Sequence, residues 1–204
     1  FFPTVDIIAK NNSKEILVPN DIYMMDIYKK IIQHDEDLGV YYTDKQYEVV
    51  NSLKQKNNFS LSAPTSFGKT MIITNFINEV VKNKKHCHIC ILVPTNALLK
   101  EVSMDMKSKY EGRNSNIKVI TYPEVKPKDT RFNNLIFVFT PERLVNYFAK
   151  NSLDIEYLFV DEAQKILKKN DDRSPVFYNA VSYASYRGTK LYFLASKTVF
   201  LINS

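Results

Sequence analysis

The chain has 204 residues, of which 45% are hydrophobic, and it carries a net charge of +6. This length and apolar content predict one domain with one substantial core, and the positive charge is compatible with a polyanionic partner. No apolar run reaches the roughly 18–20 residues that cross a bilayer, and the opening Phe1-Phe2-Pro3-Thr4 lacks the layout of a signal peptide, so we expect a cytoplasmic protein without a membrane partner.

Residues 1–40 match no motif and are expected to form a flanking segment that is helical in part. The helix is predicted over residues 20–32, where apolar side chains recur at spacings of three and four and so share one face. These side chains are Met24, Ile27, Tyr28 and Ile31. We expect this face to pack on the flank of the main domain, which is predicted to span residues 41–204.

The next helix is predicted to start at Thr43-Asp44-Lys45-Gln46, which fits a capping box. In that motif the Gln46 side chain bonds back to the Thr43 backbone. Gln46 therefore has a structural role available to it that needs no ligand.

A phosphate-binding loop is predicted at Ala63-Pro64-Thr65-Ser66-Phe67-Gly68-Lys69-Thr70. The loop follows a short strand expected over residues 59–62 and opens a helical run over residues 71–81. Backbone N–H groups and the helix N-terminus would cradle a polyphosphate, the Lys69 ammonium would reach the β- and γ-phosphates, and the Thr70 hydroxyl would ligate Mg²⁺. The predicted ligand is a nucleoside triphosphate. The alternative is an incidental Gly-Lys-Thr, because the strict pattern requires Gly where Ala63 stands.

Both cysteines lie in His86-Cys87-His88-Ile89-Cys90, which at first sight suggests a metal site. The sequence has no second Cys/His pair to complete a tetrahedral site. We therefore expect a buried strand over residues 88–93.

Strand and helix signals alternate along the rest of the chain, which predicts an α/β fold with a parallel sheet and right-handed crossovers. Helices are expected over residues 97–109, 141–150, 163–169 and 175–186, and strands over residues 117–121, 135–139 and 190–194. Thr140-Pro141 also fits an N-cap followed by proline at the first helical position.

Two adjacent carboxylates, Asp161 and Glu162, follow the mostly apolar run from Ile155 to Val160. This run is typical of a buried parallel strand. Since ligands bind at the carboxyl ends of such strands, both carboxylates would face the crevice of the phosphate loop. Asp161 suits an Mg²⁺ ligand, and Glu162 suits a base that orients and deprotonates water. The alternative is an acidic pair that only complements a helix dipole.

The order of these segments resembles that of the first RecA-like domain of superfamily 2 helicases, the DEAD/DEAH-box-like group. Ala63 to Thr70 is similar to motif I in its A-P-T-x-x-G-K-T form. Leu92 to Leu98 is similar to motif Ia, Phe139 to Leu144 to motif Ib, and Val160 to Gln164 to motif II. Gln46 stands at a spacing similar to that of the glutamine that reads adenine.

The resemblance implies a RecA-like P-loop NTPase domain with a mostly parallel sheet, helices on both faces, and ATP and Mg²⁺ as cofactors. It implies catalytic roles for Lys69, Asp161 and Glu162, and magnesium ligation by Thr70 and Asp161. The nucleotide contacts that it implies are Gln46, Thr65, Ser66, Phe67, Gly68, Lys69, Thr70 and Gln164. The nucleic-acid contacts are Pro94, Thr95, Thr140 and Arg143; Arg143 in a surface ion pair is the alternative.

The partners that the resemblance implies are nucleic acid, either DNA or RNA, and a second RecA-like domain of the same protein that supplies an arginine finger. These 204 residues alone are thus expected to be nearly inactive. The chain departs from the family at Phe67 and at Leu194-Ala195-Ser196-Lys197-Thr198, where motif III would carry Ser-Ala-Thr. A nucleotide-gated binding or scaffold module that does not translocate is the alternative function, and a P-loop kinase is disfavoured by motifs Ia and Ib.

Overall fold

The computed structural model describes residues 20–36, 39–112, 116–165 and 174–196. The chain forms two compact units, Phe1–Ser52 and Leu53–Ser204. The boundary after residue 40 that we expected between the flanking segment and the main domain stays a prediction. No helix in the described ranges is both long and apolar enough to cross a bilayer.

The first unit contains helix α2 (Asn20–Ile32), the antiparallel strands β1 (His34–Asp35) and β2 (Val40–Tyr41), and most of helix α3 (Asp44–Gln55). Lys29 Nζ and Gln33 Nε2 donate to the Asp44 carboxylate at 2.8 and 2.7 Å. These hydrogen bonds hold the pKa of Asp44 below its usual value. The carboxylate therefore ties the end of α2 to the start of α3.

Helix α2 forms where the sequence predicts it. Met24, Tyr28 and Ile31 share its apolar face and are 62%, 64% and 69% exposed. The packing of this face on the flank of the main domain stays a prediction.

The second unit contains a six-stranded sheet with the strand order β3-β8-β7-β4-β6-β5. Every neighbouring pair is parallel, as predicted from the alternation of strands and helices. The strands are β3 (Phe59–Ser62), β4 (Cys87–Leu92), β5 (Ile117–Ile120), β6 (Asn134–Phe139), β7 (Tyr157–Val160) and β8 (Lys190–Ala195). Because helices cover both faces, β6 and β7 are buried along their whole length.

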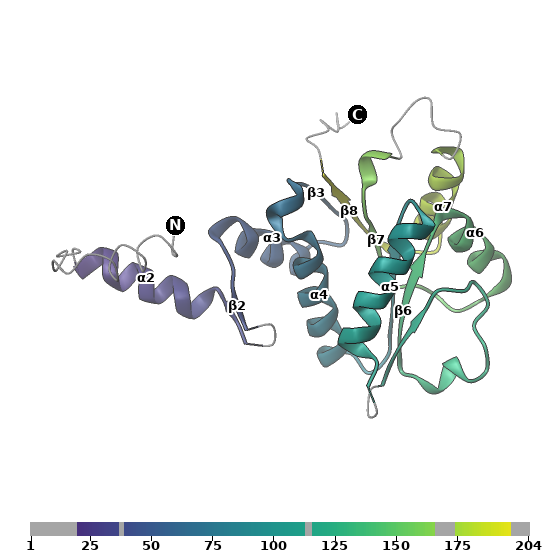
Figure 1. Ribbon diagram of the computed structural model, residues 1–204, viewed down its shortest axis with the longest axis horizontal. Coiled ribbons are helices and arrows are strands. Elements are labelled where there is room, and N and C mark those ends of the chain that lie inside the picture. Colours follow the sequence, from purple (N-terminus) through teal and green to yellow (C-terminus); the bar gives the residue numbers. More distant parts are fainter. Residues whose placement is uncertain (1–19, 37–38, 113–115, 166–173, 197–204) are drawn as a thin grey trace. The chain divides into compact units, whose positions relative to one another are not determined.

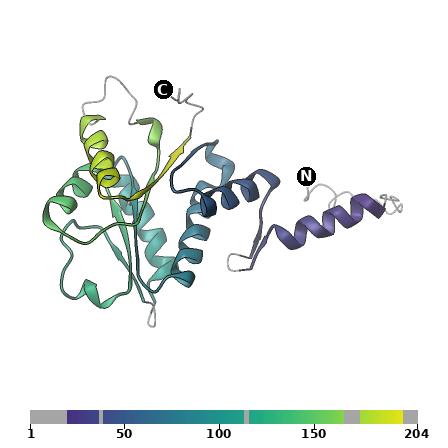
Figure 2. The same ribbon diagram turned by 180° about the vertical axis from the view of Figure 1, so that it is seen from behind.

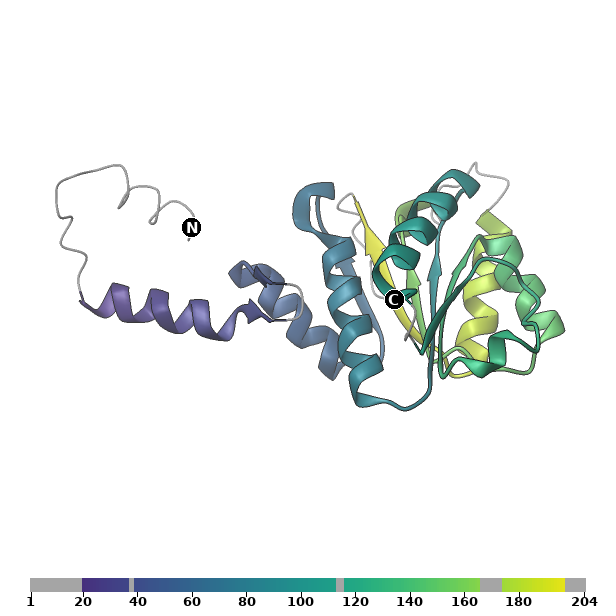
Figure 3. The ribbon, with the colours of Figure 1, turned by 60° about the horizontal axis from the view of Figure 1, so that its bottom comes forward.

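The helices lie in two layers around this sheet (Figures 1 and 3). Helices α4 (Lys69–Asn83) and α5 (Asn96–Tyr110) cover one face, and α6 (Pro141–Lys150) and α7 (Ser174–Tyr186) cover the other. The reverse view shows α6 and α7 packed side by side (Figure 2). The prediction of a sheet with helices on both faces is confirmed.

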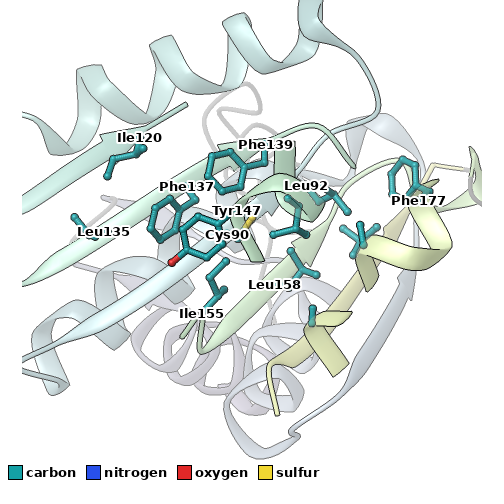
Figure 4. Close-up of a cluster of buried hydrophobic side chains, with 14 residues drawn as sticks. Cys90, Leu92, Ile120, Leu135, Phe137, Phe139, Tyr147, Ile155, Leu158 and Phe177 are labelled. Carbon is teal, nitrogen blue, oxygen red and sulfur yellow. The ribbon is translucent and has the colours of Figure 1, made fainter. Parts of the chain in front are cut away.

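Aromatic side chains fill both halves of the core. Phe137, Phe139 and Tyr147 lie between the sheet and α6 with ring centroids 4.9–5.6 Å apart (Figure 4). On the opposite face, Phe76 of α4 makes T-shaped contacts with Tyr157 and Phe159, and the ring centroids lie 5.1 and 5.3 Å apart. These contacts, together with the burial of apolar area, hold the strand ends in register for the site.

The cysteine segment forms the buried strand that we expected. Cys87 and Cys90 are 1% and 0% exposed within β4, and burial raises the pKa of Cys87 to about 12. No group of three or more possible metal ligands of the His, Cys, Asp or Glu type occurs among the described residues.

Candidate nucleotide and nucleic-acid site

The phosphate-loop segment continues directly from β3. The Ala63 N–H donates to the Ala195 carbonyl at 3.0 Å, which extends the β3–β8 pairing by one residue. The three residues Thr65–Phe67 then form a 3-10 turn, closed by a hydrogen bond from the Phe67 N–H to the Pro64 carbonyl at 3.0 Å. Ala63 is buried, so alanine fits at the position where the strict pattern has glycine.

Gly68 links this turn to helix α4. Its φ of 83° and ψ of 35° lie in the left-handed region, where glycine has no steric penalty. The Gly68 carbonyl accepts from the Ile72 N–H at 3.1 Å and so begins the helix. The helix therefore begins directly after the loop, and a helix N-terminus is able to bind an anion.

Lys69 folds back over the loop. Its Nζ donates to the carbonyls of Ala63 and Pro64 at 3.1 and 3.3 Å, and the residue is 7% exposed. The ammonium is thus held against the loop by two neutral carbonyl acceptors. The next residue, Thr70, is exposed at the start of α4.

The acidic pair stands at the carboxyl end of β7, as predicted. The Asp161 N–H donates to the Leu92 carbonyl at 2.9 Å and continues the β7–β4 pairing. Glu162 then adopts a φ of 54°, the one positive value of a non-glycine residue in the described ranges, and its N–H donates to Asp161 Oδ1 at 2.9 Å. Left-handed non-glycine residues cost about 1–3 kcal/mol and cluster at functional sites.

Ser196 is a functional candidate that we did not predict. Its hydroxyl donates to Glu162 Oε1, and its N–H donates to Gln164 Oε1 at 3.1 Å. Gln164 Nε2 in turn donates to Glu162 Oε2 at 2.5 Å. The motif III position therefore binds motif II through a closed set of three residues, although Lys197 and Thr198 lie outside the described residues.

We expect Ser196→Ala to lower the turnover of ATP by the full-length protein roughly tenfold while leaving its affinity for ATP unchanged. A hydrogen bond to a charged group contributes about 1.5–3 kcal/mol, and this one restrains the Glu162 carboxylate. Steady-state ATPase assays give kcat and KM separately. Ser196→Thr keeps a hydroxyl and should restore most of kcat. A rise in KM with unchanged kcat would contradict this positioning role.

Gln46 takes part in the capping box that the sequence predicts. Its Oε1 accepts from the Thr43 N–H at 2.9 Å, and its own N–H donates to Thr43 Oγ1 at 3.3 Å. Gln46 belongs to the first unit and the phosphate loop to the second. A contact of Gln46 with adenine therefore stays a prediction.

The motif Ia and Ib segments each join a strand end to a helix. Thr95 is the N-cap of α5, and its Oγ1 accepts from the Leu98 N–H at 3.3 Å. Thr140 is the N-cap of α6, with Pro141 as the first helical residue, but its side chain makes no capping hydrogen bond. Pro94 and Thr140 are both buried. The N–H groups at these two helix starts are the ones able to bind phosphates.

Arg143 lies in the first turn of α6 and is half-buried. Its Nη1 donates to the carbonyl of Thr121, the residue that follows β5. In the described ranges Arg143 forms no ion pair, so the alternative of a surface ion pair is not observed. The hydrogen bond fixes the guanidinium between the ends of β5 and β6.

All of these segments lie on one edge of the sheet, which is formed by the carboxyl ends of the strands. The strand order puts motif I after β3, motif III after β8, motif II after β7, motif Ia after β4 and motif Ib after β6. One strand, β8, separates motif I from motif II, and Ser196 lies at its end. Lys69 supplies positive charge at this edge, and Thr70 and Asp161 supply hard oxygen atoms of the kind that Mg²⁺ prefers. The edge thus carries the groups that a nucleoside triphosphate with its metal ion requires.

Comparison with known families gives one match over most of the chain. The model of DEAD/DEAH box helicases matches residues 43–199. This range includes the segments of motifs I, Ia, Ib and II and all of the described part of the second unit.

Three curated relatives are similar to parts of this chain. Reverse gyrase of Methanocaldococcus jannaschii is 27% identical over 72% of the chain and 10% of the relative. Anti-bacteriophage protein B of Escherichia coli is 23% identical over 74% of the chain and 18% of the relative. A probable ATP-dependent RNA helicase of M. jannaschii is 28% identical over 61% of the chain and 36% of the relative. The chain therefore spans a minor part of the length of each of these relatives.

Two solved structures share the fold. The Hef helicase domain of Pyrococcus furiosus superposes with a TM-score of 0.59 at 18% identity, over 78% of this chain and 34% of that one. The Type ISP restriction-modification enzyme LlaGI, solved with a DNA substrate mimic, gives a TM-score of 0.56 at 14% identity, over 81% of this chain and 18% of that one. At these identities the likeness concerns the fold alone.

Proposed function

Because this chain belongs to the DEAD/DEAH box helicase family, as a RecA-like motor domain, we propose that its parent protein uses ATP hydrolysis to separate or move along nucleic-acid strands. The observation that supports this proposal is that five motifs lie together at the carboxyl ends of the strands of one sheet. Motifs I, III, II, Ia and Ib follow five neighbouring strands in spatial order. The proposed nucleotide site therefore lies on the same edge of the sheet as the N-termini of α5 and α6.

In the proposed nucleotide site, Lys69 exchanges its two carbonyl acceptors for phosphate oxygens when ATP enters the loop. Its partners in this structure are neutral, so a charged phosphate is the stronger acceptor. Ser66, Phe67, Gly68 and Thr70 line the loop and the helix start, and Thr65 and Gln164 complete the nucleotide contacts.

Mg²⁺ would be held by Thr70 and Asp161, and when bound it neutralises developing charge on the phosphates. Glu162 is the proposed base, because its carboxylate is restrained by Ser196 and Gln164. A restrained base orients a water molecule for attack and accepts its proton.

The alternative of a nucleotide-gated scaffold without translocation rested on the departure of this chain from motif III. The hydrogen bonds of Ser196 to Glu162 and Gln164 weaken that argument, because they join motif III to motif II. A second RecA-like domain of the same protein is the proposed partner across the nucleotide site.

The deciding experiment measures ATP turnover by the full-length protein with single-stranded and duplex DNA and RNA. Both nucleic acids belong in the assay, because one relative carries the name of an RNA helicase and one structural neighbour was solved with a DNA mimic. Stimulation by at least one nucleic acid is expected. Turnover that none of them changes would contradict the motor and favour the scaffold.

Arg143→Ala is expected to weaken binding of single strands about equally for unrelated sequences and to flatten the salt dependence by roughly one unit. Backbone contacts carry no sequence information, which explains the uniform loss. The measurement titrates full-length protein with oligonucleotides over a range of salt.

Arg143→Gln is a second variant, which removes the charge and keeps a shorter side chain with an N–H donor. The exposed Lys107 near the end of α5 serves as a control for net charge. Unchanged affinity and salt slope in the Arg143→Gln variant would remove Arg143 from the binding face.

A further inference from the structure

Strand β5 is the last strand on one side of the six-stranded sheet, and among the described strands it pairs only with β6. Successive residues of a paired strand turn their backbone groups alternately toward the neighbouring strand and away from it. The Asn134 N–H donates to the Asn116 carbonyl at 3.1 Å, so the residues of β5 that face β6 are those of even number. Val119 therefore turns its N–H to the outer side of β5, the side away from β6, where the described residues supply no further strand.

The side chain of Glu111 closes the outer side of β5. Its Oε1 accepts from the Val119 N–H at 2.9 Å, and Lys118 Nζ lies 3.1 Å from the same oxygen. Glu111 is the C-cap of α5, and its own N–H donates to the Lys107 carbonyl at 2.9 Å. The carboxylate thus reaches the strand from a fixed position at the end of a helix and takes a donor that a further strand would use.

This contact is partly sheltered from water. The side chains of Glu111 and Lys118 are 25% and 32% exposed, and the Lys118 ammonium lies 5.9 Å from the ring centroid of Phe132. A hydrogen bond to a carboxylate is roughly twice as strong as one between neutral groups, and partial burial reduces its screening by salt. The neutral carbonyl of another strand is therefore a weaker acceptor for the Val119 N–H than Glu111 is.

The residues of β5 are otherwise suited to pairing with a further strand. Ile117, Val119 and Ile120 are β-branched, which favours strand structure. An outer strand that offers backbone donors and acceptors is a template for a strand of another chain. Every copy of this protein carries the same outer side, so two copies would pair β5 with β5 about a two-fold axis. The partner that Glu111 excludes is therefore a second copy of this chain.

We propose that Glu111 makes an autoinhibitory contact: it occupies the outer side of β5 and keeps the protein from pairing through this strand with a second copy. Lys118 supports the contact by holding the carboxylate, and its charge adds repulsion between two copies that lie side by side. Strand β5 and the phosphate loop lie at opposite ends of the strand order, so the contact acts whether or not the protein hydrolyses ATP.

Glu111→Ala is expected to free the Val119 N–H and to increase self-association of the full-length protein. Two copies of the wild-type protein must each give up one charge-assisted hydrogen bond to pair, so without Glu111 self-association should tighten by roughly 10²–10⁴-fold. Sedimentation equilibrium over a range of protein concentrations measures the dissociation constant of the dimer. Hydrogen exchange of the peptide that contains Val119 should be faster than in wild type at low concentration and slow again in the dimer.

Three further variants identify the contact that is responsible. Glu111→Gln keeps an acceptor for the Val119 N–H and should associate less than Glu111→Ala. Glu101→Ala removes the same charge from an exposed position on α5 and should behave as wild type. Val119→Pro, added to Glu111→Ala, removes the donor itself on the side of the strand where proline is tolerated, and should abolish the dimer. Thermal unfolding verifies that each variant is folded.

Self-association of Glu111→Ala equal to that of wild type would overturn the proposal. So would a dimer that survives Val119→Pro, because its interface would lie on another surface, and so would equal tightening in Glu101→Ala, which would trace the effect to net charge. Lys118→Ala tests the same contact if Glu111→Ala does not fold. It removes the ion pair and leaves Glu111 in place, and a folded Lys118→Ala protein that associates no more tightly than wild type would equally contradict the proposal.

Discussion

Lys69→Ala should abolish detectable ATP binding by the full-length protein, whereas Glu162→Gln should bind ATP normally and fail to turn it over. The two side chains stand on opposite sides of β8, at the ends of β3 and β7. The pair of variants therefore separates the phosphate-binding half of the site from the hydrolytic half.

The expected loss of binding follows from the position of the Lys69 ammonium. It already has two acceptors at 3.1 and 3.3 Å inside the loop, so phosphates replace neutral carbonyls and the gain comes from their charge. At about 1.5–3 kcal/mol for each charged hydrogen bond, two lost phosphate contacts correspond to roughly a 10²–10⁴-fold loss of affinity.

Glu162→Gln keeps the shape of the side chain and its partners, Ser196 and Gln164, but cannot accept a proton from water. Removing a general base costs roughly 10²–10⁴ in rate. Turnover should therefore fall while the affinity measured in the absence of turnover stays within a few-fold of wild type.

Calorimetric or fluorescent-nucleotide titration gives the affinity, and phosphate release gives the turnover. Lys107→Ala is the matched lysine control, and thermal unfolding of each variant checks that it is folded. Normal ATP affinity in the Lys69→Ala protein would disprove the phosphate-loop assignment. Wild-type turnover in the Glu162→Gln protein would mean that another residue is the general base.

The sheet and the motif positions could be predicted from the sequence because their signals are local. We can recognise an apolar run that ends in Asp161 and Glu162, or a strand followed by Gly68 and Lys69, without knowing which distant residues they contact. The parallel sheet then brings those strand ends to one edge, which is a general property of α/β folds. The Thr43–Gln46 capping box is equally local, and the structure contains it.

The contacts that could not be predicted join residues far apart in the sequence. Ser196 meets Glu162 because β8 pairs with β7, and a search for Ser-Ala-Thr misses the spelling Ala195-Ser196-Lys197-Thr198. Arg143 meets Thr121 because β5 pairs with β6. Either contact could be predicted only from the order of the strands in the sheet. The periodicity within one segment does not give that order.

Helix α2 shows a different limit. The spacing of Met24, Tyr28 and Ile31 predicts the helix correctly, but the same spacing does not determine whether a partner covers the apolar face. An amphipathic pattern fixes which side chains share a face. Their exposure depends on tertiary contacts that no local signal encodes.

The isolated 204 residues should bind ATP but hydrolyse it about 10³–10⁵-fold more slowly than the full-length protein does with nucleic acid. This factor is the range of rate acceleration that an arginine finger contributes. None of the three described arginines belongs to the segments of motifs I, II and III. Arg143 donates to the Thr121 carbonyl after β5, Arg187 donates to the Asn151 carbonyl at 3.2 Å, and Arg131 lies in the connection between β5 and β6.

In the proposed motor, the charge that stabilises the transition state comes from the second RecA-like domain. Phosphate release by the isolated chain, corrected with its Lys69→Ala variant as background, measures the residual rate, and nucleotide titration of the same sample verifies that ATP is bound. Turnover within tenfold of the full-length protein would mean that this chain completes its own catalytic site. In that case the arginine that stabilises the transition state would be one of this chain's own residues. Arg143→Gln and Arg187→Gln would be the first variants to assay, because each substitution removes the charge and keeps a side-chain N–H donor.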